Sequence, residues 1–127
     1  MDWIFDSGAS SHMSNSSTML SNCTSSPFSS ITLGNGSTIP IYSTGHTELP
    51  STLKPLLLRD VLVAPALIKN LISVQKFTYD NLVSVEFDPF GLSVKDLQTK
   101  EEIARFNSFG DLCCINGAPT ASPPSSM

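Results

Sequence analysis

Residues 3–12 read WIFDSGASSH, which is a short apolar run followed by an acid, a hydroxyl residue and a glycine. The apolar run predicts a buried strand that ends at Asp6. Gly8 predicts a tight turn directly after the strand, because a residue with a Cβ atom would resist one. A carboxylate at the end of a rigid strand suits acid–base catalysis, with Ser7 placed to hydrogen-bond nearby. The alternative is an Asx-turn, in which Asp6 only caps its own backbone.

The composition predicts one globular domain with few charges. The chain has 127 residues, of which 40% are hydrophobic and 14% are charged, and this length allows one modest core. The formal net charge is −4 and the basic residues are scattered, which argues against a surface that binds nucleic acid. The apolar stretches are too short to predict a membrane span.

The cysteines Cys23, Cys113 and Cys114 are odd in number and lack a C-x-x-C spacing. We therefore expect free thiols and a reducing compartment. A metal site built from Cys23, His12 and His46 is not favoured, because three scattered ligand-type residues are common by chance. We expect no metal and no other cofactor.

Residues 31–41 predict a β-hairpin. Asn35 and Gly36 separate two runs of alternating apolar residues, and Asn-Gly is the strongest short signal for a hairpin turn. A type I′ turn would place both residues at positive φ. The arms are expected to project from the domain, either as a lid over a substrate or as an ordinary exposed hairpin. The second arm is expected to continue to Leu49, with a bulge or kink at Gly45.

The remaining pattern predicts a mostly β domain with one short helix. Residues 10–30 are nearly half serine and are expected to form a surface loop. Residues 56–63 fit a central strand, and apolar residues at helical spacing predict a helix over about residues 70–78. Four further strands are expected to form a C-terminal meander: residues 83–87, 92–97, 103–106 and 112–115.

A single Asp-Ser-Gly copy supplies half of an aspartic protease site. Such a site needs two carboxylates about 3 Å apart that share one proton. We therefore expect a two-fold dimer in which Asp6 faces its equivalent across the axis. A serine hydrolase using Ser10 or Ser11 with His12 is not favoured, because neighbouring strand residues point to opposite faces and the G-x-S-x-G elbow is missing.

Taken in order, these motifs resemble the protease region of Copia-type (Ty1/Copia) long-terminal-repeat retrotransposon polyproteins of plants. The resemblance covers residues 2 to about 116. It implies an all-β, retropepsin-like closed β-barrel with one short helix and a C-terminal β-meander, over residues 1–116. Residues 117–127 are Pro/Ser-rich and are expected to be disordered. The stretches that carry the resemblance are residues 3–12, 31–37 with Gly45, 60–65, 70–74, 87–99 and 110–112.

The resemblance also implies an aspartic endopeptidase that cuts its own gag-pol polyprotein as a homodimer. Asp6 would be the catalytic acid, and Ser7 would brace the two active-site loops across the dimer. Gly8 would supply the turn and a backbone N–H near the carboxylate. The residues at or near the tip of a substrate-covering flap would be Gly34, Asn35, Gly36 and Ser37.

The implied partners are a second copy of the chain and peptide segments of its own polyprotein. Direct binding of nucleic acid or membrane is not expected, and the implied location is the cytoplasm, in a virus-like particle. The alternative function is a retropepsin-like barrel that has no catalytic activity and acts as an interaction module.

Overall fold

The computed structural model describes residues 3–18, 20–25, 30–49, 51, 53–109 and 112–115. These residues form an all-β domain with one short helix, as the sequence predicted. The expected disordered segment, residues 117–127, lies outside the described residues. In chain order the elements are β1 (Trp3–Asp6), β2 (Met13–Ser14), β3 (Ser21–Ser25), β4 (Ser30–Thr32), β5 (Thr38–Pro40), β6 (Ser43–Leu49), β7 (Leu56–Val63), β8 (Asn70–Ser73), α1 (Val74–Asn81), β9 (Val83–Asp88), β10 (Gly91–Asp96), β11 (Glu102–Phe109) and β12 (Leu112–Ile115).

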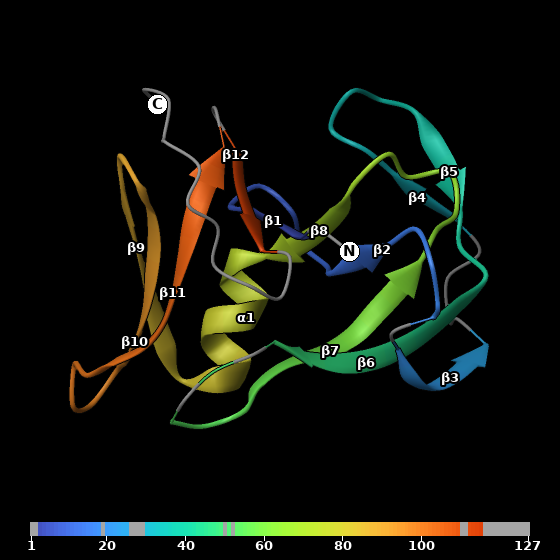
Figure 1. The fold of residues 1–127 in the computed structure, drawn as a ribbon. Helices are drawn as coiled ribbons and strands as arrows, with labels where there is room; N and C mark the ends of the chain where they lie inside the picture. The colour runs from blue at the N-terminus through green and yellow to red at the C-terminus, as the bar shows by residue number, and fades with distance from the viewer. Residues whose placement is uncertain are drawn as a thin grey trace.

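Ten strands form one sheet in the order β3-β6-β7-β2-β8-β1-β12-β11-β10-β9, and β4 and β5 form a separate hairpin. The sheet curves so that β9, β10 and β11 form one wing and β3, β6 and β7 the other, with α1 between them (Figure 1). The ladder of described strands ends at β3 and β9 and is not closed by a pairing between them. A closed barrel therefore stays an expectation.

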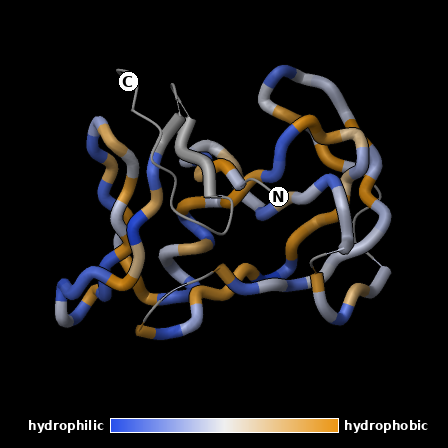
Figure 2. The backbone as a smooth tube through the Cα atoms, in the orientation of Figure 1, coloured by the Kyte–Doolittle hydropathy of each residue, from blue (hydrophilic) through white to orange (hydrophobic). Residues whose placement is uncertain are grey.

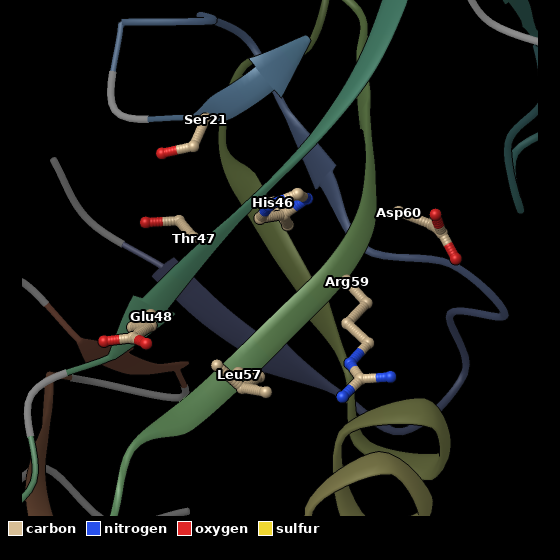
Figure 3. Close-up of a pocket in the computed structure, with 7 residues that line it drawn as sticks. All are labelled: Ser21, His46, Thr47, Glu48, Leu57, Arg59 and Asp60. Atoms are coloured by element: carbon tan, nitrogen blue, oxygen red, sulfur yellow. The ribbon is translucent and has the colours of Figure 1, made fainter. Parts of the chain in front are cut away.

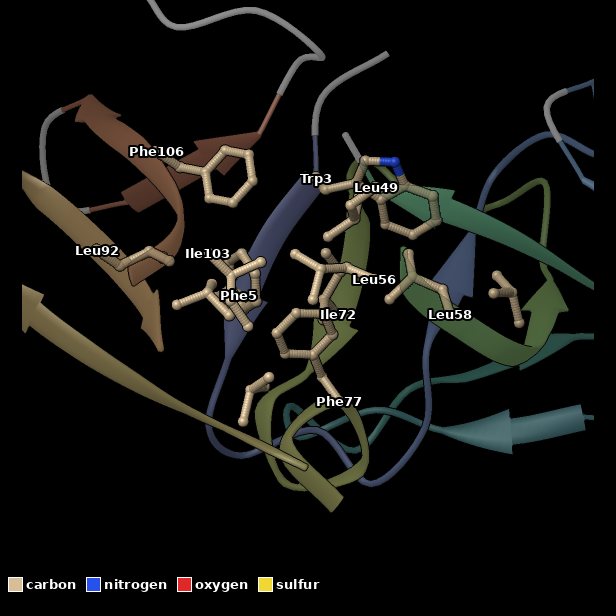
Figure 4. Packing of buried hydrophobic residues seen from close by; sticks show 13 residues of the cluster. Trp3, Phe5, Leu49, Leu56, Leu58, Ile72, Phe77, Leu92, Ile103 and Phe106 are labelled. Carbon is tan, nitrogen blue, oxygen red and sulfur yellow. The ribbon is translucent and has the colours of Figure 1, made fainter. Parts of the chain in front are cut away.

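Strand β1 lies in the middle of the sheet and carries the core. It pairs in parallel with β8 and antiparallel with β12, and all three of its apolar residues are buried. Phe5 packs edge to face on Phe77 of α1, with ring centroids 5.3 Å apart, and lies 6.3 Å from Phe106 of β11. Figure 4 shows these rings meeting between the two wings. The core therefore holds β1 rigidly from several elements at once.

A second, smaller cluster lies beneath the β4–β5 hairpin. Met13, Ile41 and Leu62 are buried there, and half-buried Ile31 and Ile39 of the hairpin pack against them. The hairpin is hydrophilic at its tip and hydrophobic nearer the body of the domain (Figure 2). The base of the hairpin is thus anchored by apolar contacts, whereas its tip extends from the domain.

Several expected strands are confirmed. β7 spans residues 56–63, and β9 to β12 form the expected meander. The second hairpin arm does not continue to Leu49 as expected, because β5 ends at Pro40 and the chain then enters the main sheet as β6. The bulge or kink at Gly45 is confirmed, since Gly45 lies at a register shift between β6 and β7. A Cβ atom at Gly45 would lie 2.9 Å from Cys23 Sγ, so the glycine lets β3 approach β6 closely.

The expected helix over residues 70–78 is wrong at its start. Residues 70–73 form β8, and α1 begins only at Val74. Ser73 caps the helix, because its side-chain oxygen accepts a hydrogen bond from the Lys76 N–H at 3.2 Å. A short apolar run is compatible with either a helix or a buried strand, and pairing with β1 selects the strand here.

The expected surface loop over residues 10–30 is also wrong in part. His12, Met13 and Ser14 are buried, and β2 lies between β7 and β8 in the sheet. Residues 21–25 form the exposed edge strand β3. The high serine content led to the prediction of a loop, so β2 was missed. A short strand that is paired on both sides can bury a hydroxyl residue when its hydrogen bonds are satisfied. Ser14 is an example, since its Oγ donates a hydrogen bond to the Ser16 carbonyl.

The helix found in the described part of the chain, α1, is too short to cross a membrane.

Candidate functional site

Asp6 occupies the last position of β1, directly opposite Ser73 in the parallel pair with β8. Its Oδ1 atom accepts a 2.8 Å hydrogen bond from the backbone N–H of Gly8, and the N–H of Ala9 reaches the Asp6 carbonyl at 3.4 Å. This is the geometry of an Asx-turn. Within the described residues no hydrogen bond reaches Oδ2, so one carboxylate oxygen is available to another group.

The expectation that the turn after β1 requires a glycine at position 8 is wrong. Gly8 does not have a positive φ, and a Cβ atom built on it would meet only Asp6 Oδ1, at 3.4 Å. That distance is an ordinary van der Waals contact, so the turn within one chain does not require glycine. Gly8 does place its N–H on the carboxylate, as expected.

A groove of about 740 Å³ lies beside Asp6. Asp6 and Ser7 form part of its wall, and Leu33, Asn35 and Ser37 of the hairpin segment face the same space. Two segments that lie almost thirty residues apart in the sequence thus share one groove. The other residues that line it are Ile4, Phe5, Ile39, Ala66, Leu67, Ile68, Lys69 and Leu71.

The turn at the hairpin tip differs from the type I′ turn considered above. Leu33 N–H donates to the Ser37 carbonyl at 2.7 Å, and Gly36 N–H donates to the Leu33 carbonyl at 2.9 Å. The Leu33–Ser37 hydrogen bond leaves three residues, 34–36, to connect the arms, and among these three only Gly36 has a positive φ, of +89°. Asn35 Oδ1 accepts from the Ser37 N–H at 3.0 Å and from its hydroxyl at 2.6 Å, which holds Asn35 outside the left-handed region.

His12 is fully buried, and its role is structural in a way that the sequence did not suggest. Its Nδ1 atom accepts a 3.0 Å hydrogen bond from the Ser73 N–H, and its carbonyl accepts from the Leu62 N–H at 2.9 Å. Burial, reinforced by the charge of Lys76, lowers the pKa of His12 to about 4, although Asp80 and Asp60 oppose this shift. The neutral imidazole therefore links the segment after Asp6 to β8.

A second hollow, of about 860 Å³, lies on β3, β6 and β7 (Figure 3). Glu48, Arg59 and Asp60 line it with charges of both signs, and His46 hydrogen-bonds the Asn22 side chain at 3.1 Å. His46 therefore lies at this second hollow, whereas His12 is buried beside Ser73, so the two histidines do not belong to one site. Among the residues that the structure describes, no three histidine, cysteine or acidic side chains are grouped as metal ligands would be.

Sequence reasoning identified the Asp6 turn and the hairpin, but it missed the third side of the groove. Residues 66–69 connect β7 to β8 and supply that side. The sequence predicted the strand over residues 56–63, but only the pairing of β8 with β1 brings the connection that follows it next to Asp6. The fold and groove define a small all-β domain that presents a strand-end carboxylate beneath a hairpin.

Comparison with known proteins agrees with this description. Residues 3–82 match the family described as "Pol polyprotein, beta-barrel domain". The chain belongs to this family. It is 42% identical over 101 residues to the "Retrovirus-related Pol polyprotein from transposon RE1" of Arabidopsis thaliana, and equally identical to the corresponding polyprotein from transposon RE2.

Each alignment covers 77% of this chain but only 7% of the polyprotein, so the chain spans a small part of its curated relatives. No solved structure matches the chain. The chain is therefore similar to one region of a retrotransposon Pol polyprotein. This confirms the expected relation to retrotransposon polyproteins.

Proposed function

We propose that this chain is the aspartic endopeptidase domain of a Copia-type retrotransposon and that it cleaves the gag-pol precursor. The observation that carries the proposal is the shared groove, which Asp6 and Ser7 line together with Leu33, Asn35 and Ser37. A carboxylate on a rigid strand end can activate water. A hairpin over it can exclude solvent and hold an extended peptide.

The chemistry requires a second copy of the chain. In an aspartic protease dyad, the ionised carboxylate takes a proton from the attacking water while the protonated one donates a hydrogen bond to the substrate carbonyl, so two carboxyl groups must share one proton. We therefore propose a homodimer in which the Asp6 carboxylates meet across a two-fold axis, with Ser7 bracing the two turns. The free Oδ2 atom of Asp6 and the exposed Ser7 and Gly8 support this arrangement.

A retropepsin-like closed barrel, with Gly34 to Ser37 as the flap tip, belongs to the same proposal. Its partners are a second copy and segments of its own polyprotein, without direct contact to nucleic acid or membrane. Its location is the cytoplasmic virus-like particle. The curvature of the sheet around α1 is compatible with a barrel (Figure 1).

The test is cleavage of a mixed-sequence peptide library by the purified chain at about pH 5, followed by mass spectrometry. We expect cleavage that a statine-containing peptide inhibits, since such a peptide mimics the tetrahedral transition state. Activity per chain should rise with protein concentration, because only dimers assemble the dyad. The pH profile should be bell-shaped, as expected for two carboxylates that share one proton.

The variant Asp6→Asn should abolish cleavage and keep the fold, because the change is nearly isosteric and an amide cannot accept the proton. Asp60→Asn is the matched control: Asp60 is exposed, lies outside the groove and has a φ of +55°, which asparagine tolerates. A folded, dimeric wild type without cleavage would instead favour the interaction module. Cleavage that survives Asp6→Asn would exclude Asp6 as the catalytic acid.

A further inference from the structure

The groove beside Asp6 is mainly apolar and contains one cation. Apolar side chains from β1, the hairpin segment and the β7–β8 connection line most of it. Ile68 leaves 90% of its surface exposed at this wall, so a bound chain can cover it. Among the described residues that line the groove, Lys69 and Asp6 are the charged ones. The groove therefore has a positive part and a negative part within an apolar surface.

Lys69 differs from most lysines of the domain because its side chain has no partner among the described residues. Lys54, Lys76 and Lys95 each form an ion pair with a carboxylate. In the part of the chain that the structure describes, the Lys69 side chain forms no ion pair or hydrogen bond. Its ammonium group is thus available to a ligand carboxylate, and a charge-assisted hydrogen bond is stronger than a neutral one.

We propose that the groove selects extended peptides that carry an acidic side chain close to a bulky apolar one, and that Lys69 determines this selection. The inference rests on the proposed function, because it treats the groove as the substrate site. Asp6 repels a second carboxylate, whereas Lys69 attracts it, so the acidic residue lies at the Lys69 part of the groove. A neutral peptide residue next to Lys69 would remove water from the ammonium group without forming an ion pair with it, which lowers the affinity of the peptide.

The test is an acid scan of a decapeptide whose centre is Leu-Phe and whose other residues are uncharged. Glutamate is placed at each outer position in turn, and glutamine at the same position is the neutral match. Binding of the fluorescein-labelled peptides is measured by anisotropy on the Asp6→Asn chain, which should not cleave them. At one or two neighbouring positions, glutamate should bind roughly three- to tenfold tighter than glutamine. The ratio should shrink as salt is added.

Variants at Lys69 show whether this residue is responsible. Lys69→Gln should remove the glutamate preference, and Lys69→Glu should reverse it, so that a lysine peptide binds more tightly than a glutamate peptide. Lys100→Gln is the matched control, since Lys100 is also exposed but does not line the groove. It should leave the preference unchanged. Equal melting temperatures would show that the variants remain folded.

Equal binding of glutamate and glutamine peptides at every position overturns the inference, as does a preference that survives Lys69→Gln or a failure of all peptides to bind. The proposed function is judged separately, by cleavage with the wild-type chain. Cleavage without any preference for glutamate refutes the role of Lys69 and leaves the endopeptidase standing. A Lys69-dependent preference without cleavage supports the role of Lys69 and refutes the endopeptidase.

Discussion

The imidazole of His12 and the backbone N–H of Ser73 are joined by a buried 3.0 Å hydrogen bond. Ser73 also lies opposite Asp6 in the sheet and caps α1 through its side chain. One hydrogen bond thus couples the chain after the Asp6 turn, the strand beside Asp6 and the start of the helix. Because Nδ1 accepts this bond, the imidazole is in its neutral form.

The free energy of unfolding should depend on pH through His12. The pKa of His12 is about 4 in the folded protein, below the ordinary histidine value of 6.5, so the unfolded chain binds more protons between these two pH values. The contribution is fully present above about pH 6.5 and is lost as the pH falls toward 4. A shift of this size corresponds to about 3 kcal/mol. Urea unfolding at about pH 7.5 and about pH 4.5 measures it.

The control for this prediction is His12→Gln, which can still accept the Ser73 hydrogen bond but does not titrate. Its unfolding free energy should change much less between the two pH values. Hydrogen bonds from Arg105 lower the pKa of Asp88 to about 2. The contribution of Asp88 to the free energy of unfolding is present above about pH 3.8 and is lost as the pH falls below that value. This loss therefore lies outside the range between about pH 6.5 and 4 in which His12 acts. An equal loss in wild type and His12→Gln would refute the prediction.

Gly36→Val should separate the two interpretations of the hairpin. Gly36 has a φ of +89°, which a β-branched residue adopts at a cost of roughly 1–3 kcal/mol. If the tip is a flap, kcat/KM on a cleaved peptide should fall by more than the lost stability explains, because most molecules stay folded. Gly34→Val adds bulk to the same tip without backbone strain, since its Cβ would meet no atom within 4 Å and its φ is not positive, so it should lower kcat/KM less than Gly36→Val does. A lower melting temperature with unchanged turnover would identify an ordinary hairpin.

Leu82→Gly should stabilise the domain. Leu82 ends α1 in the left-handed conformation, with φ 55° and ψ 52°, and the residue is 64% exposed. Glycine avoids the left-handed strain of an L-residue, and little buried surface is lost, so we expect a gain of about 0.5–1 kcal/mol. Thermal unfolding measures the gain. Leu82→Ala shortens the side chain but keeps the Cβ atom and should give no such gain; equal effects of the two variants would contradict the strain argument.

Gly91→Ala should destabilise the domain strongly. A Cβ atom at Gly91 would lie 2.0 Å from the Phe106 carbonyl oxygen and 2.9 Å from the Asn107 Cα atom. These are backbone atoms of the paired strand β11, so the β10–β11 ladder must shift, at a cost of about 3 kcal/mol or more. Gly8→Ala, whose Cβ meets only an ordinary contact, should change the melting temperature little. Similar losses in both variants would show that the clash does not govern stability.

The sequence by itself determined the elements that depend on neighbouring residues. The apolar run before Asp6, the glycine-rich hairpin tip and the alternating C-terminal strands all have local patterns, and each appears in the structure. Local patterns are sufficient here because alternation and turn chemistry act over a few residues. The strand-end position of Asp6 could therefore be predicted from the local sequence.

Only the tertiary structure decided which distant segments meet. Residues 70–73 form a strand instead of a helix because they pair with β1, which lies more than sixty residues earlier in the chain. The same pairing buries His12 against Ser73 and brings Lys69 to the groove of Asp6. The physical reason is that an apolar run is stabilised by burial in either a helix or a strand. Its conformation is then chosen by the hydrogen-bonding partner available there, and the local pattern does not specify that partner.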